Sequence, residues 1–378
     1  MLAALAVATV AGIALLWPGE VQTQIAQGLA VDRERAEVVR VEERLCAGFT
    51  EQRCQLATFR LESGPDRGGR GRIQLGAGGV EPDVDPGDEI YVTKTPERAA
   101  GQPAVTGPGY SLSDFERRGP MLVLAAIFVL AVLLFARLRG ALSLAGLAVS
   151  LALVVVFVVP AILDGAPPLA VAVVGAMAIA LVTIPLAHGG GAKSIAALLG
   201  TAASLLLTAA LAALFTELAH LTGLASEEAA LLQLGQGDLS LQGLLLAGMV
   251  IAALGVLDDV TVSQASTVLA LRAANPALGF RELFRRALRV GRDHVSATVN
   301  TLVLAYVGAA LPVLLLFSAA DLGVGEVLNF ELVAQEVVAT LVGSIGLIAA
   351  VPLTTALAAG LALDEEPEVL AADGGQGH

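Results

Sequence analysis

The sequence predicts a polytopic α-helical membrane protein of about eight transmembrane helices, with a small extracytoplasmic β-rich domain between helices 1 and 2. Apolar residues make up 56% of the 378 residues and charged residues only 15%, whereas a soluble domain carries about a quarter charged residues. The charges are also unevenly placed, because residues 20–118 hold 13 of the 22 Lys and Arg and 17 of the 35 Asp and Glu. A polar segment is therefore inserted into a chain whose expected solvent is the bilayer.

Eight apolar stretches are candidates for the crossings, because a helix needs about 20 mostly apolar residues to span the hydrocarbon. They are Leu2–Trp17, Pro120–Ala136, Leu142–Leu163, Pro168–Ala187, Ile195–Leu218, Gly243–Leu257, Val295–Phe317 and Val337–Leu363. The first could instead be a cleaved signal peptide, but it lacks a charged n-region. We favour a retained anchor over residues 1–19, followed by the external domain at 20–118, a seven-helix bundle at 119–363 and an acidic tail at 364–378.

The orientation follows from Lys and Arg in the short loops, which concentrate on the cytoplasmic side. Alternate loops carry nine such residues, and the loops around Asp164, at 219–240 and at 318–336 carry none. We therefore expect a plasma-membrane protein with residues 20–118 outside and the C-terminus in the cytoplasm.

The external segment has the pattern of short strands. Ala36–Arg44, Cys54–Glu62, Gly71–Leu75 and Glu89–Lys94 are rich in β-branched residues and partly alternating, which predicts a small β-barrel or sandwich. Asp83, Asp85 and Asp88 could form a calcium loop, but Pro86-Gly87 explains the run as a turn. Cys46 and Cys54, the two cysteines of the chain, would suit a disulfide across a hairpin in an oxidising compartment.

The candidate binding residues begin with the adjacent acids Asp258 and Asp259. The sixth stretch has only 15 apolar residues before them, so either the helix ends there with its acids in water or it continues past them. In a continuous helix Asp259 shares one stripe with Gly248, Gly255, Ser263 and Ser266, and small residues let another helix approach. Asp259 would then point into the bundle, and Asp258 would lie about 100° around the helix.

An ionisable residue at membrane depth is costly and usually serves a function. On that interpretation Asp259, alone or together with Asp258, binds a cation or proton. Ser263 and Ser266, together with Asn300 and Thr301 of the seventh stretch, would supply neutral oxygen ligands.

A basic amphipathic helix is predicted just before the seventh stretch. Arg281, Arg285, Arg289 and Arg292 recur on one face, opposite apolar residues. Such a helix lies on a membrane surface and contacts anionic lipid, although docking of an acidic partner is the alternative.

Other ligands are not expected. The four histidines are scattered and no Cys/His cluster has zinc spacing, so we predict no metal site and no cofactor. No basic footprint for nucleic acid dominates. Val174-Gly175 to Pro185-Leu186 and Val342-Gly343 to Pro352-Leu353 look alike, which raises the possibility of a duplicated half.

Several segments resemble the YibE/F family of bacterial multi-pass membrane proteins. They are ALGVLDDVTVSQAS (253–266), GRDHVSATVNTLVLAYVGAALP (291–312), LVGSIGLIAAVPLT (341–354), GGGAKSIAALLGT (189–201) and YVTKTPE (91–97). In the family pattern a single Asp stands where this chain has two, and it matches Asp259. The resemblance implies a polytopic membrane protein without an assigned reaction.

Two functions from different classes follow. The first is a transporter or ion-coupled permease with an acidic site near the inner interface. The second is a non-transporting scaffold or sensor whose external domain binds an envelope partner. An intramembrane hydrolase would need a facing acid pair or a nucleophile with a base, and the sequence has neither pattern, so we expect no enzymatic activity.

Overall fold

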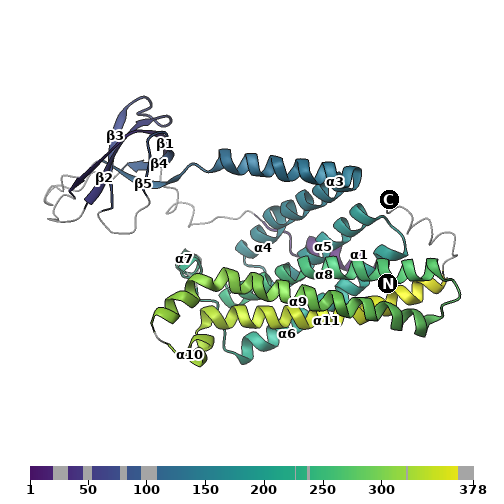
Figure 1. The fold of residues 1–378 in the computed structure, drawn as a ribbon. Coiled ribbons are helices and arrows are strands. Elements are labelled where there is room, and N and C mark those ends of the chain that lie inside the picture. Colours follow the sequence, from purple (N-terminus) through teal and green to yellow (C-terminus); the bar gives the residue numbers. More distant parts are fainter. Residues whose placement is uncertain are drawn as a thin grey trace. The chain divides into compact units, whose positions relative to one another are not determined.

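The computed structural model describes residues 1–19, 33–45, 53–76, 83–94, 109–225, 227–235, 239–320 and 322–364 (Figure 1). These residues belong to two compact units. One is Met1–Ile25 with Phe135–His378, a helical bundle, and the other is Ala26–Leu134, which holds the β-sheet and the first part of a long helix.

The described residues of the β unit form a five-stranded antiparallel sheet in the order β3-β2-β1-β4-β5. Its strands are β1 Arg33–Leu45, β2 Arg53–Leu61, β3 Arg70–Leu75, β4 Glu89–Lys94 and β5 Tyr110–Phe115. Alternate residues turn inward, so that Val38, Phe59, Ile73 and Ile90 form one core. Gly71 is required beside Phe59, because a Cβ there would lie 2.2 Å from the phenyl ring.

The strand prediction is confirmed for β1 to β4, but the predicted sandwich is wrong and the closed barrel is replaced by a half-barrel. The sheet curls enough for Phe59 of β2 to meet Tyr110 of β5 edge to face, with ring centroids 5.3 Å apart. β5 escaped prediction because its serines and aspartate resemble a turn, although Tyr110 and Leu112 pack inward.

The aspartate run is a turn. Asp85 N–H donates to the Asp88 carboxylate at 2.8 Å, and Gly87 has φ +99°, which favours glycine. Cys54 is buried at the start of β2, opposite Arg44 across the β1–β2 hairpin. Cys46 lies outside the described residues, so its pairing with Cys54 stays a prediction.

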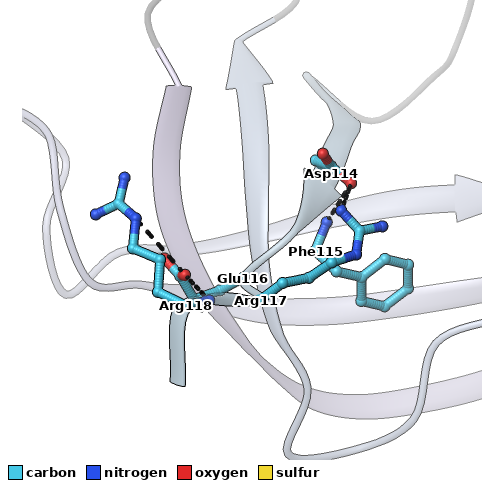
Figure 2. Close-up of polar contacts among 5 residues, drawn as sticks. All are labelled: Asp114, Phe115, Glu116, Arg117 and Arg118. Carbon is cyan, nitrogen blue, oxygen red and sulfur yellow. Dashed lines mark hydrogen bonds and ion pairs between the residues drawn. The ribbon is translucent and has the colours of Figure 1, made fainter. Parts of the chain in front are cut away.

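Charged contacts fix the exit of the chain from β5. Arg117 pairs with Asp114 at 2.6 Å, and the Arg118 N–H donates to Glu116 at 2.8 Å (Figure 2). Glu116 also accepts a hydrogen bond from the Tyr91 hydroxyl of β4. The end of β5 and the start of α3 are thereby joined to the neighbouring strand β4.

Six helical segments among the described residues are long and apolar enough to cross a membrane. They are α3 Arg118–Leu153, continued by η1 Val154–Val158 and α4 Val159–Leu163; α5 Pro168–His188; α6 Ala192–Leu218; α8 Leu241–Ala274; α9 Phe280–Ala319; and α11 Glu331–Asp364. The short helices are α1 Leu2–Leu15, α7 Glu227–Gly235 and α10 Val324–Asn329.

Two of these helices differ from the predicted crossings. At Arg137 the backbone leaves the helical region (φ 49°, ψ −125°) and divides the first segment between the predicted second and third crossings. α1 has only 14 residues, fewer than a full span needs. It packs against α5, where a Cβ on Gly12 would lie 2.8 Å from Val174.

The helix α8 is the centre of the bundle and packs against α5, α6, α9 and α11. Figure 1 shows α8, α9 and α11 running alongside one another. The α5–α6 and α8–α9 connections lie at one end, which we call the basic end because Lys193, Arg272 and Arg281 are there. The opposite end holds the segment after α6 and the beginning of α11.

Candidate functional site

The predicted acidic segment lies beside an open cavity of about 690 Å³ between α8 and the last residue of α5. The helix α8 continues without interruption from Leu241 to Ala274, which confirms the continuous-helix interpretation. The residues lining the cavity are His188, Gly255, Asp258, Asp259, Val262, Ser263, Ser266, Thr267 and Ala270. The structure thus brings together four of the six predicted binding residues.

The two aspartates lie in different environments. Asp258 is half-buried, and its Oδ1 is buried without a hydrogen-bond partner in the described part of the chain. Asp259 is exposed to the cavity. The prediction that Asp259 points into the packed bundle is wrong, because Asp258 is the more buried of the two.

The reason lies in the stripe of small residues that Asp259 shares. No neighbouring side chain or backbone lies within 4 Å of a Cβ built on Gly248 or Gly255. The packed face of α8 instead contains Val250, Leu257 and Ala265. Because no other described helix fills the stripe, the small side chains leave a groove open beside the acids.

A second cavity of about 240 Å³ adjoins the first and shares His188 and Asp258 with it. Its other walls are α3 and α5, through Ser143, Gly146, Leu147, Thr183, Ile184 and Ala187. Asp258 and His188 therefore line the junction of the two cavities, both of which are partly open.

Sequence reasoning missed His188, because the four histidines are scattered along the chain. The available signal was its position as the last residue of α5, before Gly189, at the same end as Asp258. The charges of Lys193, Arg139 and Asp259 all act on its imidazole. The cavity thus combines two carboxylates, one imidazole and nearby cations.

Hydroxyl groups form the rest of the polar lining. Ser266 donates to the Val262 carbonyl at 2.8 Å and Thr267 donates to the Ser263 carbonyl at 3.0 Å. These bonds use the hydroxyl hydrogens and leave oxygen lone pairs available as acceptors. The lining can therefore offer neutral and anionic oxygens together.

Asn300 and Thr301 do not join this cavity. Both are exposed on α9, and Thr301 donates back to the Ala297 carbonyl at 3.1 Å. Val295 and Val299 of α9 instead pack against an apolar cluster of Val260 from α8 and Leu347 and Val351 from α11. Among the described residues, no group of three or more His, Cys, Asp or Glu is placed to hold a metal ion.

The basic face is present, and it forms the first turns of the long helix α9 rather than a separate helix. Leu283, Ala287 and Gly291 are buried, while Arg281, Arg285, Arg289 and Arg292 are exposed. The segment is continuous with α9, whose 40 residues make a helix of about 60 Å, twice the hydrocarbon thickness of about 30 Å.

The charge of this face is reduced by Glu282, which pairs with Arg285 and Arg286. Contact of the remaining arginines with lipid headgroups stays a prediction. A continuous helix would place them beyond the hydrocarbon at the basic end.

Comparisons with known proteins bear on the whole bundle. Neither the search of curated proteins nor that of solved structures found a match. A scan of protein families matches residues 124–363 to the family described as YibE/F-like protein. This region holds both aspartates and most of α3 to α11. The chain therefore belongs to the YibE/F-like family.

Proposed function

We propose that the chain is a proton- or cation-coupled membrane transporter in which Asp258 carries the coupling charge and Asp259 assists it. The observation that supports this most strongly is the buried, unpartnered Asp258 oxygen at the junction of two cavities. Burying a carboxylate without a partner is costly. A proton or a cation in the junction would remove that cost, and an equilibrium between bound and empty forms is what coupling requires.

The depth of Asp258 supports the same proposal. It follows Leu241 by 17 residues, which is about 26 Å along a helix, against a hydrocarbon thickness of about 30 Å. The acid would lie inside the membrane near the basic end. Given the distribution of Lys and Arg, we place this end in the cytoplasm of a bacterium and residues 20–118 outside.

The test uses the full-length protein in liposomes, with flux of H⁺, Na⁺ and K⁺ followed by fluorescent indicators. Asp258→Asn should abolish the flux, and Asp259→Asn should reduce it. The control is Asp293→Asn, which removes an exposed carboxylate of α9 and should leave flux unchanged. Wild-type flux with Asn at 258, at normal expression, would exclude this role.

Binding of a proton or cation at Asp258 can be measured with dicyclohexylcarbodiimide, which modifies carboxyl groups in protein interiors. We expect mass spectrometry to find the adduct on Asp258. Addition of the coupling cation should slow the formation of the adduct; if the coupling ion is H⁺, a raised pH should slow it instead. Equal rates at every pH and with every cation would contradict a coupling site.

A second candidate, a scaffold or sensor, is favoured by the separation of Ala26–Leu134 as a compact unit with its own core. It predicts that photo-crosslinkers placed at exposed β1 residues of the full-length protein capture the same envelope protein in repeated experiments. If crosslinkers at β1 and on α9 capture the same proteins, the scaffold or sensor function would be contradicted.

A further inference from the structure

We infer that the hairpins α5–α6 and α9–α11 form an inverted repeat that opens the α8 groove alternately at the two ends of the bundle, with the α6–α11 contact as pivot. This rests on the proposed transport function and names the device that would perform it. Many transporters contain two repeats of opposite orientation that exchange conformations around a fixed site.

The sequence carries a trace of the repeat. LTAALAA at 207–213 in α6 and LTTALAA at 353–359 in α11 differ at one position. Upstream, Gly200 and Gly346 each precede their threonine, Thr208 or Thr354, by eight residues. This register differs from the α5–α11 similarity suggested by Gly175 and Gly343.

The contacts show that the two copies meet each other reciprocally. A Cβ on Gly200 would lie 2.0 Å from Thr354 Oγ1, and a Cβ on Gly346 would lie 2.0 Å from Thr208 Oγ1. Each glycine therefore receives the threonine of the other copy. Contacts in which i meets j and j meets i are the signature of a two-fold axis, and the antiparallel pairing inverts one copy relative to the other.

The surroundings of this symmetric pair are asymmetric. At the end opposite the basic end, the Glu331 carboxylate of α11 accepts hydrogen bonds from Thr222 N–H at 2.6 Å, Gly223 N–H at 2.7 Å and the Thr222 hydroxyl at 2.9 Å. We call these contacts the Glu331 clasp. At the basic end the open cavity occupies the groove instead.

The outer helices of the hairpins are asymmetric too. In the most apolar 18-residue stretch of α5 half of the residues are buried, whereas in the most apolar 18-residue stretch of α9 none is buried. α5 meets α8 closely, since a Cβ on Gly243 would lie 3.1 Å from Pro168.

Symmetry then separates contacts that persist from contacts that break. When two repeats exchange conformations, a contact that maps onto itself is present in both states. The Gly–Thr pairs are of this kind and form the pivot. The Glu331 clasp has no counterpart among the described residues, so it belongs to the state open at the basic end. The Pro168–Gly243 contact lies at the same end as the clasp, and α9 meets α8 at the basic end through the hydrogen bond from Gln264 to Ala287.

The test measures access to the groove from each side of the membrane in the full-length protein. The reporter is Ser263→Cys, labelled with a membrane-impermeant maleimide in right-side-out and inside-out vesicles and quantified by mass spectrometry. We expect labelling mainly from the basic side. Glu331→Gln should raise labelling from the opposite side about tenfold, because it weakens charge-assisted hydrogen bonds.

Two further variants guard against a general loss of structure. Thr222→Val removes the hydroxyl of the clasp and leaves its N–H donor, so it should give a smaller rise in the same direction. Glu326→Gln removes a carboxylate of α10 outside the clasp and should give none. A similar rise in labelling from the opposite side with Glu326→Gln and with Glu331→Gln would show that the Glu331 clasp does not control access to the groove.

Disulfide cross-links test the pivot. In the Glu331→Gln background, a Pro168→Cys/Gly243→Cys cross-link should abolish labelling from the opposite side, whereas a Thr208→Cys/Gly346→Cys cross-link should leave it intact. The reverse result would overturn the inverted repeat. Labelling needs no ion, so two-sided access in a protein that shows no flux would refute the transport proposal and leave this device standing.

Discussion

At the scale of single residues, the two aspartates show what a helical wheel omits. The wheel placed Asp258 and Asp259 about 100° apart, and they do lie in different environments. Which one faces the packed interior depends on where neighbouring helices lie. Small residues permit close approach, but beside Gly248 and Gly255 no described helix approaches.

The reverse holds at Gly200, where a helix does approach. Gly200→Ala should destabilise the protein by about 1–3 kcal/mol, the usual cost of overpacking, because the new Cβ would lie 3.3 Å from the Thr354 Cα as well as against its side chain. Gly346→Ala should behave alike. Thermal unfolding in detergent measures this.

The matched control is Gly248→Ala, whose Cβ meets nothing within 4 Å. It should leave stability unchanged or raise it, because alanine favours helix over glycine by about 1 kcal/mol. Equal melting temperatures for Gly200→Ala and Gly248→Ala would contradict the close α6–α11 contact.

A pH prediction belongs to Tyr91 of the β unit. Its hydrogen bond to Glu116 raises the pKa of the phenol above the ordinary value of 10.0. A group whose folded pKa is raised stabilises the fold below its unfolded pKa, and this contribution is lost as pH rises through the folded pKa. The contact should therefore weaken only in strongly alkaline solution.

The measurement is the tyrosinate absorbance of the full-length chain carrying Tyr110→Phe and Tyr306→Phe, which leaves Tyr91 as the single tyrosine. Adding Glu116→Gln should lower the midpoint toward 10. Adding Glu42→Gln, at a carboxylate that pairs with Arg40 and Arg44, should not. An unchanged midpoint in Glu116→Gln would contradict the assigned cause.

At the scale of elements, the lengths of the helices depended more on tertiary packing than on hydropathy. The apolar part of α8 ends before Asp258, yet the helix runs on because Val260, Ala265 and Val268 keep it packed. The basic segment continues into α9 for the same reason, since Leu283 and Ala287 are fully buried. Both segments are held by tertiary packing, which hydropathy alone does not indicate.

Gln264 fastens three of these helices together. Its buried amide donates from α8 to the Thr355 hydroxyl of α11 at 2.7 Å and to the Ala287 carbonyl of α9 at 3.0 Å. Gln264→Met keeps the volume and removes both bonds. We expect a loss of about 1–2 kcal/mol, since interhelical hydrogen bonds in membranes contribute about 0.6 kcal/mol each and the abandoned hydroxyl adds a cost.

Unfolding in mixed micelles of detergent and dodecyl sulfate measures this loss. Gln242→Met, which removes a 3.2 Å bond to the Leu221 carbonyl at the exposed end of α8, should cost less. A greater loss at 242 than at 264 would show that Gln264 does not link the helices as described.

At the scale of the whole molecule, the chain divides into two units, whose compositions suit the two solvents that the sequence indicated, water and the bilayer. Residues with alternating polarity form the sheet of the β unit, and long apolar runs form the bundle. The acidic site lies in the bundle, in the region matched by the YibE/F-like family. Transport, as we propose it, concerns this region, and binding of an envelope partner would concern the other.

The sequence by itself determined the class of protein, four of the five strands, the approximate positions of the long helices and the segment that holds the acids. These depend on local composition and period, which each stretch carries within itself. The packing of the helices made Asp258 the more buried aspartate, placed His188 beside the same two cavities and left Asn300 and Thr301 outside them. The tertiary structure also revealed the reciprocal Gly–Thr contacts. Such features depend on which helix faces are neighbours, and residues far apart in the chain set that jointly.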